Sequence, residues 1–152
     1  MSDIENRLAA LGIVLPQPVA PVANYVPFVF SGAQLFISGQ VSTDAQGGIK
    51  GSVGGDVDLA QGQAAARLCG INLISQMKAA LGDLGRVKRI VKLGGFVQAA
   101  EGFTAIPQVV NGCSDLMVEV FGDAGRHARS AVGVYQLPLG FAVEVDAIVE
   151  VA

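Results

Sequence analysis

Two residues of opposite charge enclose an apolar stretch near the end of the chain. Arg129 is followed by fourteen uncharged residues, and Glu144 is the next charged residue. On an extended strand, Ala131 and Gly133 lie on the same side as Arg129 and leave a hollow beside its guanidinium. A guanidinium fork next to a hollow suits a carboxylate or a phosphate, which it binds through two parallel hydrogen bonds. The residues alone leave two interpretations open: an anion site at Arg129, or an ion pair of Arg129 with an acid of a neighbouring strand or subunit.

The strand expected over residues 142–151 alternates between apolar and acidic side chains. Glu144, Asp146, Ile148 and Glu150 share one side of it, since successive side chains of a strand point to opposite faces. We expect this acidic side to face water or another subunit. The other side should pack on helices, and it carries Val143, Val145, Ala147, Val149 and Val151.

The preceding strand, expected over residues 130–136, sets the direction of Arg129. A tight turn centred on residues 138–139 makes the last two strands neighbours, and Arg129 and Glu144 then face the same side. A one-residue change of register reverses this relation. The alternate residues on the face opposite to Arg129 suit the core: Ser130, Val132 and Val134.

The elements that position these residues follow one another in the order β-β-α-β-α-β-β. This order predicts an α+β sandwich in which the two long helices pack on one face of a mixed sheet. The whole chain, 1–152, is expected to form one domain, in which residues 1–24 are an N-terminal helix and an extended, proline-rich lead-in. The expected elements are two strands within 25–41 that turn near Ser31 and Gly32, a helix from Asp58 to about Leu81, a strand over 89–97, a helix over 104–121, and strands over 130–136 and 142–151.

Composition bears on assembly and location. Hydrophobic residues make up 51% of the chain and charged residues only 15%, against about 25% charged residues in an average domain. A small monomer needs a polar surface, so we expect part of the surface to be buried against copies of the same chain. Residues 8–43 carry no charge, but prolines interrupt them, and a membrane span needs about 20 continuous apolar residues. Neither a span nor a secretory leader is expected, and the predicted location is the cytoplasm, with the protein soluble.

Several classes of ligand fit the sequence poorly. The net charge is −3, and the basic cluster in residues 86–92 is typical of a solvated strand face, so a nucleic acid is not the expected partner. Cys69, Cys113 and the single histidine, His127, are too few for a structural zinc site. We expect both cysteines to be buried thiols and His127 to be a surface residue. The glycine-rich segment 42–58 lacks the Gly-Lys-Ser/Thr ending of a nucleotide loop. No metal and no cofactor are predicted.

Five segments carry a resemblance to a known family. They are LFISGQV, GQAAARLCGINLISQMKAAL, RIVKLGGFV, VVNGCSDLMVEVFG and the final ARSAV-V--LP----VEV-AI, and together they span nearly all of residues 20–150. In this order they resemble the Rid family (reactive intermediate deaminase, also called YjgF or endoribonuclease L-PSP-like). The resemblance implies the fold of the trimeric bacterial type of chorismate mutase. It also implies a homotrimer whose subunits join their sheets in a central core, with clefts between neighbours.

The resemblance further implies a site in each cleft. Arg129 stands at the position of the arginine that binds the substrate carboxylate, and Glu144 at that of the acid that orients the attacking water. The residues implied to line the pocket are Tyr25, Ser38, Gly39, Gln40, Phe103, Asn111 and Ala131. Ala131 replaces a cysteine that is frequent in the family, and about four residues are inserted around AIPQ. The segment FGDAGRHARSAVGV resembles a branch distinct from the archetypal deaminase.

Three functions are open to this chain. The resemblance implies an enamine/imine deaminase that hydrolyses small 2-imino acids to 2-keto acids and ammonia, with no metal required. The departures favour the alternative of a non-catalytic or regulatory protein that binds a small carboxylate-bearing metabolite in the same cleft. The family's older name adds an endoribonuclease or translation inhibitor, which an acidic chain with one histidine and no basic groove fits poorly.

Overall fold

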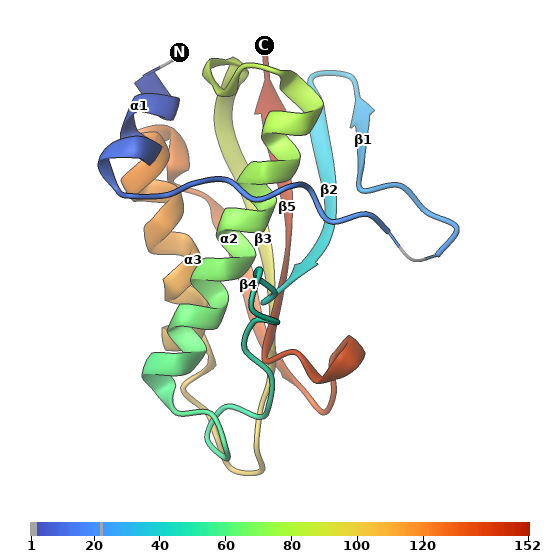
Figure 1. Ribbon diagram of the computed structural model, residues 1–152, viewed down its shortest axis with the longest axis vertical. Coiled ribbons are helices and arrows are strands. Elements are labelled where there is room, and N and C mark those ends of the chain that lie inside the picture. Colours follow the sequence, from blue (N-terminus) through green and yellow to red (C-terminus); the bar gives the residue numbers. More distant parts are fainter. Residues whose placement is uncertain (1–2, 22) are drawn as a thin grey trace.

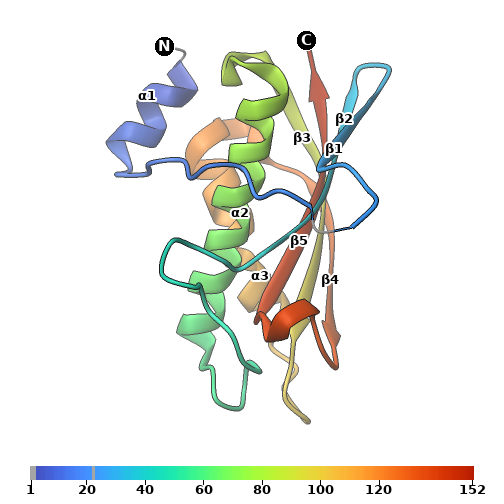
Figure 2. The ribbon, with the colours of Figure 1, turned by 45° about the vertical axis from the view of Figure 1, so that its right-hand side comes forward.

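The computed structural model describes residues 3–21 and 23–152, which form two layers (Figure 1). One layer is a five-stranded sheet, and the other contains α2 and α3, with the short α1 beside α3 (Figure 2). The predicted α+β architecture, with two long helices on one face of a mixed sheet, is confirmed. The elements are α1 (Asp3–Ala10), β1 (Phe28–Ser31), β2 (Gln34–Val41), α2 (Leu59–Leu81), β3 (Val87–Gln98), α3 (Ile106–Phe121), β4 (Ala128–Val134) and β5 (Val143–Val151), with 3₁₀ helices η1 (Leu84–Arg86), η2 (Gly122–Gly125) and η3 (Pro138–Gly140).

The strands of the sheet lie in the order β1-β2-β5-β3-β4. β5 runs antiparallel to both of its neighbours, whereas β4 pairs in parallel with β3. α3 forms the crossover that a parallel pair requires. The expected direct pairing of the last two strands is therefore wrong, because β3 separates them. The valine-rich β5 buries more apolar surface in the middle of the sheet than it would beyond β4 at the edge.

The parallel pairing also reverses the expected faces of β4. Arg129 is paired with Leu93, which is fully buried under the helices, so Arg129 faces the helix layer. Val132 is paired with Phe96 and is 45% exposed on the other face of the sheet. The prediction that Ser130, Val132 and Val134 face the core is wrong. It failed because the parity of β4 follows from its register with β3 and not from a turn leading into β5.

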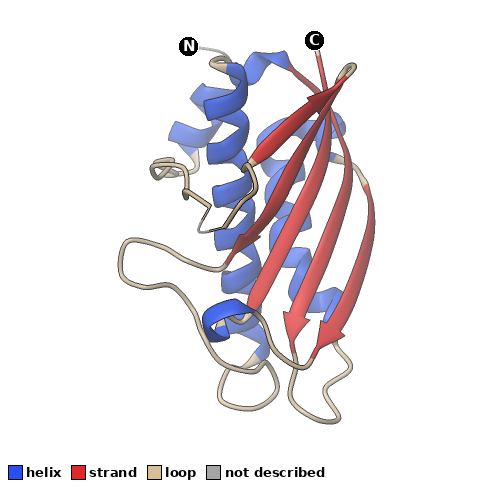
Figure 3. Ribbon diagram, turned by 90° about the vertical axis from the view of Figure 1, so that its right-hand side faces the viewer, coloured by secondary structure: helices blue, strands red, loops and turns tan. Residues whose placement is uncertain are grey.

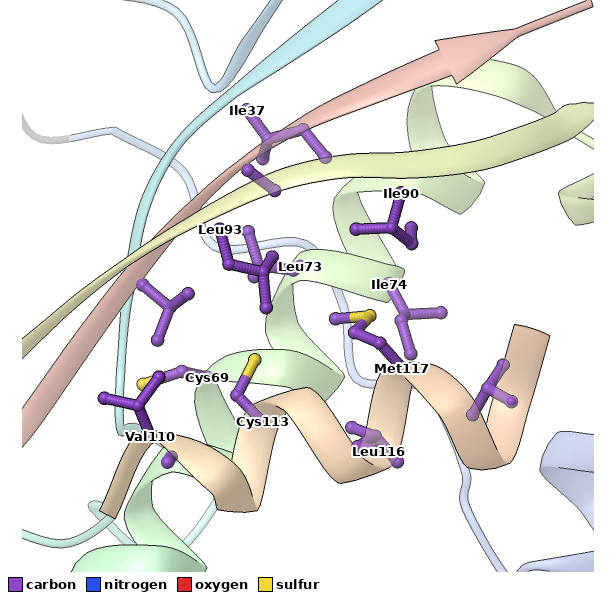
Figure 4. Packing of buried hydrophobic residues seen from close by; sticks show 14 of the residues in the cluster. Ile37, Cys69, Leu73, Ile74, Ile90, Leu93, Val110, Cys113, Leu116 and Met117 are labelled. Carbon is purple, nitrogen blue, oxygen red and sulfur yellow. The ribbon is translucent and has the colours of Figure 1, made fainter. Parts of the chain in front are cut away.

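The core lies between the sheet and the two long helices (Figure 4). The valine-rich side of β5 is buried in it, as predicted. Asp58 begins α2 with a capping box, in which its carboxylate accepts from the Gln61 N–H at 2.8 Å and Gln61 Oε1 accepts from the Asp58 N–H at 2.9 Å. Cys69 and Cys113 are buried and free, as predicted, and burial raises the pKa of Cys113 to about 12.

The sheet face opposite the helices is uncovered in the described part of the chain (Figure 3). Phe36 on β2 is 39% exposed there. A cavity of about 450 Å³ lies on this face, and its lining includes Phe96, Lys92 and Asp146. Burial raises the pKa of Asp146, while the Gly94 N–H and Lys92 act against this rise. None of the described helices combines the length and the apolar character that a membrane-spanning segment requires.

Candidate functional site

Five of the nine predicted site residues line one pocket, which we call the β2–β5 pocket. It has a volume of about 170 Å³ and lies where β2 and β5 meet η3 and the segment that precedes β1. The predicted residues in its wall are Tyr25, Ser38, Gly39, Gln40 and Glu144. The rest of the wall is apolar and consists of Val19, Ala20, Pro21, Pro27, Val41, Pro138, Leu139 and Phe141. The pocket thus presents one carboxyl group in largely apolar surroundings.

Glu144 is the acid of this pocket. Its carboxyl group lies against Gly39, where a Cβ atom would come within 2.6 Å of Glu144 Oε2. Any larger residue at position 39 would therefore displace the carboxyl group. Burial raises the pKa of Glu144, and the negative charge of Asp146 raises it further. A carboxyl group with a raised pKa exchanges its proton closer to neutral pH, which suits acid–base chemistry.

An irregularity in β2 brings its backbone to the pocket. The register between β2 and β5 shifts between Ile37 and Gln40, as at a β-bulge, and a bulge redirects the side chains that follow it. Ser38 Oγ donates to the carbonyl of Val26 at 2.8 Å, and Gln40 Nε2 donates to the carbonyl of Ser38 at 3.0 Å. These two bonds hold the segment in place and join it to the chain that precedes β1.

α2 anchors the segment that forms the outer wall. This lead-in runs across α2 between α1 and β1 (Figure 1). Ser75 Oγ donates to the carbonyl of Pro16 at 2.7 Å, and Gln76 Nε2 donates to the carbonyl of Val19 at 3.0 Å. Tyr25, near the end of the lead-in, is 51% exposed at the mouth of the pocket. The position of the outer wall is therefore set by α2.

Arg129 lies apart from this pocket, against α3. Its Nη1 donates to Ser114 Oγ at 2.9 Å, and its Nη2 donates to the carbonyl of Pro107 at 3.2 Å. Asn111 lies on the same side of α3 between these two contacts, because residues three and four apart share a helix face. Ala131 follows Arg129 on the same side of β4. We call Asn111, Ser114, Arg129 and Ala131 the α3–β4 cluster.

The guanidinium of Arg129 has only neutral partners in the described part of the chain. Ion pairs there involve Arg67, Lys78 and Arg126, but none involves Arg129. The two hydrogen bonds to α3 use two of the five N–H groups that a guanidinium carries, so three remain. Because its charge is not neutralised and its orientation is fixed, this side chain can bind an anion.

Arg129 and Glu144 lie on opposite faces of the sheet. Arg129 shares a face with its partner Leu93, and Glu144 shares the other face with its partner Phe96. Their Cα atoms are two strands and three residues apart, or about 14 Å at ordinary strand spacings. The expectation that both side chains face the same side is therefore wrong, because it assumed that β4 and β5 pair directly. One small molecule cannot contact both side chains of the same chain.

Comparison with known proteins agrees with this architecture. Residues 5–150 match the family described as "YjgF/chorismate_mutase-like, putative endoribonuclease". The chain belongs to the YjgF/chorismate mutase-like family. The resemblance carried by the five segments is confirmed, and so is the fold that it implied.

Within the YjgF family the chain has relatives at different distances. It is 55% identical to "Protein TCP17" of Trypanosoma cruzi over 149 residues, which are 97% of this chain and 93% of that protein. The Atu1372 protein of Agrobacterium tumefaciens, described as having unknown function, is 48% identical with a TM-score of 0.92, over 98% of this chain and 92% of that one. The YjgF gene product of Escherichia coli is 28% identical with a TM-score of 0.63, over 88% of this chain and 92% of that one. The chain is thus much closer to Atu1372 than to the E. coli YjgF protein.

One predicted residue belongs to neither group of the candidate site. Phe103, in the loop between β3 and α3, packs against Gly54, where a Cβ atom would come within 2.6 Å of its ring. It is partly buried against the core. Its contact with a ligand stays a prediction.

In the described residues, no three His, Cys, Asp or Glu side chains are grouped so that they could hold a metal ion.

Two residues of the α3–β4 region were missed or misjudged by sequence reasoning. Ser114 was not considered, although it lies three residues after Asn111 and thus on the same helix face. His127 was expected to be a surface residue. It is partly buried, with Nδ1 2.6 Å from the carbonyl oxygen of Gly125 and Nε2 2.9 Å from Ser114 Oγ. Only the packing of η2 on α3 brings these groups together.

Proposed function

We propose that the protein is a homotrimer in which the β2–β5 pocket of one subunit faces the α3–β4 cluster of the next. Two halves of one site on opposite sheet faces can meet only if a second copy supplies one of them. The uncovered sheet face, with the exposed side chains of Phe36 and Val132, supports an assembly through this face. The low content of charged residues, 15%, supports it too.

The proposed reaction is the hydrolysis of a 2-imino acid to a 2-keto acid and ammonia. Arg129 binds the carboxylate through two parallel hydrogen bonds. Glu144 takes a proton from water as the water oxygen bonds to the imine carbon, and it returns this proton to the nitrogen, which gives a tetrahedral carbinolamine. The hydroxyl proton of the carbinolamine then passes through Glu144 to the nitrogen, and ammonia leaves as the C–N bond breaks and the C=O bond forms. The imine carbon is already electrophilic, so positioning and proton transfer suffice.

The apolar wall of the β2–β5 pocket favours a substrate with an aliphatic side chain. Val19, Pro21 and Phe141 are within reach of such a group, and burial of each additional CH₂ contributes about 0.8 kcal/mol. With Tyr25 and Glu144 as the polar groups of the wall, the reacting carbon would lie at the polar end and the side chain at the apolar end.

The observation that carries this proposal is the state of Arg129. It is partly buried, it is fixed by two neutral acceptors on α3, and it retains three donors without any acid beside it in the described residues. An arginine that served only stability at such a position would be expected to pair with a carboxylate, as Arg67 and Arg126 do.

Substitution of Arg129 tests the proposal. With 2-iminopropanoate generated in situ, we expect Arg129→Ala to lower kcat/KM by about 100-fold, since a charge-assisted bidentate pair contributes roughly 3 kcal/mol. Arg129→Lys should recover only part of the loss, because an ammonium lacks the planar fork. Formation of the 2-keto acid is followed against a buffer blank.

Arg126→Ala is the matched control, because Arg126 is only three residues away and forms an exposed ion pair with Asp123. It should hydrolyse the imine at the wild-type rate. A wild-type rate no higher than that of buffer would remove the proposed activity. A fully active Arg129→Ala variant would remove the role of Arg129.

The second candidate is a protein that binds a carboxylate without converting it. Ala131, where a cysteine is frequent in the family, and the low similarity to the E. coli YjgF protein favour it. Calorimetry with 2-ketobutyrate distinguishes the two: binding that depends on Arg129, with no turnover of several imines, supports this second function over the first.

The family description also names an endoribonuclease. The net charge of −3 opposes the binding of a polyanion. RNA cleavage that co-purifies with the protein through successive columns and is lost in His127→Ala would support this third function; cleavage that is unchanged in His127→Ala points to a contaminant.

A further inference from the structure

Hydrogen bonds connect Arg129 to the backbone of η2 through Ser114 and His127, and we call this set of bonds the relay. Arg129 Nη1 lies 2.9 Å from Ser114 Oγ, which lies 2.9 Å from His127 Nε2. The other ring nitrogen of His127, Nδ1, lies 2.6 Å from the carbonyl oxygen of Gly125. All three side chains are partly buried, between α3 and the start of β4.

With a neutral imidazole on His127, the chemistry of the two ends determines the direction of each bond. A carbonyl oxygen only accepts, so His127 Nδ1 carries a proton and donates to Gly125. In the neutral ring Nε2 is then unprotonated, and it accepts the hydroxyl proton of Ser114. The lone pairs of Ser114 Oγ are left for Arg129, whose guanidinium only donates. Each donor of the relay therefore meets an acceptor, and no two donors or two acceptors face each other.

Contacts between α3 and η2 hold the relay in place. Gly125 is buried, and a Cβ atom on it would come within 2.1 Å of the Met117 carbonyl oxygen, so η2 lies directly on α3. Ser114 and Pro107, the two partners of Arg129, both belong to α3. The guanidinium is therefore held at two points of one helix, and one of these points is braced by His127.

We propose that Ser114 and His127 are positioning residues, which orient the guanidinium of Arg129 for a substrate carboxylate. This inference rests on the proposed function of Arg129. A neutral brace has an advantage over an acid: Asp or Glu at position 114 would neutralise the charge that binds the substrate, whereas a serine hydroxyl fixes the fork and leaves the charge intact. The relay favours an anionic ligand, because its remaining donors all belong to the positively charged guanidinium of Arg129.

The first test is spectroscopic and needs no substrate. His127 is the single histidine of the chain, so its two ring nitrogens give one pair of ¹⁵N signals. At about pH 9, where imidazoles are neutral, we expect the tautomer with the proton on Nδ1. Ser114→Ala should shift the Nε2 signal. A proton on Nε2 in the wild type would overturn the relay, whatever the activity of the protein.

The second test separates positioning from catalysis. We expect Ser114→Ala to raise the KM for 2-iminopropanoate and the Kd for 2-ketobutyrate by about tenfold, the effect of roughly one hydrogen bond, with kcat changed less than twofold. Ser114→Thr retains the hydroxyl and should restore both constants. His127→Phe should also raise KM, but by a smaller factor, because the hydroxyl of Ser114 remains. Ser31→Ala, at the exposed end of β1, is the control and should equal the wild type.

The outcomes separate this inference from the proposed function. If Arg129→Ala loses binding while Ser114→Ala binds like the wild type, the relay is overturned and the role of Arg129 stands. If Ser114→Thr is as weak as Ser114→Ala, the hydroxyl is not what matters and the inference fails. If the wild type binds 2-ketobutyrate without hydrolysing any imine and Ser114→Ala weakens that binding, the relay stands and the hydrolase does not.

Discussion

At the scale of single residues, the surroundings of the two ionisable groups of the candidate site differ in their effect on charge. Arg129 is fixed by neutral acceptors and retains its charge. Glu144 is buried beside Asp146, and its pKa is raised. A group that binds a carboxylate must stay charged, and a group that exchanges a proton benefits from a pKa closer to neutral pH. The surroundings of each residue agree with the role proposed for it.

The raised pKa of Glu144 predicts a dependence of stability on pH. Because the native pKa lies above the unfolded one, the native state binds more protons between the two values, and the free energy of unfolding falls as the pH rises through them. Glu144→Gln removes this contribution. We expect E144Q to unfold at a higher temperature than the wild type at about pH 8, and at the same temperature at about pH 4, below the ordinary glutamate pKa of about 4.3.

Calorimetric unfolding across this pH range measures the effect. Glu150→Gln is the matched control, because Glu150 lies on the same face of β5 near its end. The wild type and E150Q should give parallel curves. An E144Q curve that is parallel to the wild-type curve as well would contradict the raised pKa.

At the scale of elements, the site depends on how closely α2 and α3 approach each other. A Cβ atom on Gly112 of α3 would come within 2.0 Å of the Gln63 carbonyl oxygen on α2, and one on Gly70 within 2.8 Å of Leu116. Glycine in a helix normally costs about 1 kcal/mol relative to alanine. Here it permits a contact that positions α3, and with it the partners of Arg129, against the helix that anchors the lead-in.

This close approach predicts the sign of a substitution. Gly112→Ala should destabilise the protein by roughly 1–3 kcal/mol, because the backbone of α2 must move, although alanine favours the helix itself. Chemical denaturation measures the change. Gly55→Ala is the control, since a Cβ atom there is no closer than 3.3 Å to its nearest neighbour, and it should change stability far less. Increased stability of G112A would show that the two helices can separate without cost.

At the scale of the whole molecule, the two halves of the site lie on opposite faces of one sheet. The helix-covered face holds the α3–β4 cluster, and the uncovered face meets the β2–β5 pocket at Glu144. The uncovered face also carries exposed aromatic and aliphatic side chains. Assembly of copies through this face accounts for both features, which is the basis of the proposed trimer.

A charge on the uncovered face tests the assembly. Phe36 is 39% exposed in the single chain, so Phe36→Glu should leave the fold intact and dissociate the trimer, because an unpaired charge in an apolar interface is strongly unfavourable. Sedimentation at about 10 μM, where a stable trimer of this kind is expected to persist, should show a monomer for F36E only. Val14→Glu, at a lead-in residue that is 90% exposed, is the control. A monomeric wild type would rule out a site shared between subunits.

Local sequence patterns were enough to predict the order of the main strands and helices. Periodicity and helix-boundary residues are local, so they indicated the start of α2 after Asp58, the end of α3 at residue 121 and the buried side of β5. The family resemblance indicated Gly39 and Glu144 as site residues, and these two residues do line one pocket.

Which strands are neighbours depends on the packing of the whole chain. The position of β5 between β2 and β3 depends on burial summed over the whole sheet, and no short segment of sequence encodes it. This strand order places Arg129 on the helix side of the sheet, away from Glu144. It also places His127, which follows η2, within hydrogen-bonding distance of Ser114. Side-chain direction alternates with every residue of a strand, so the face of each charge becomes known only when the pairing of its strand is known.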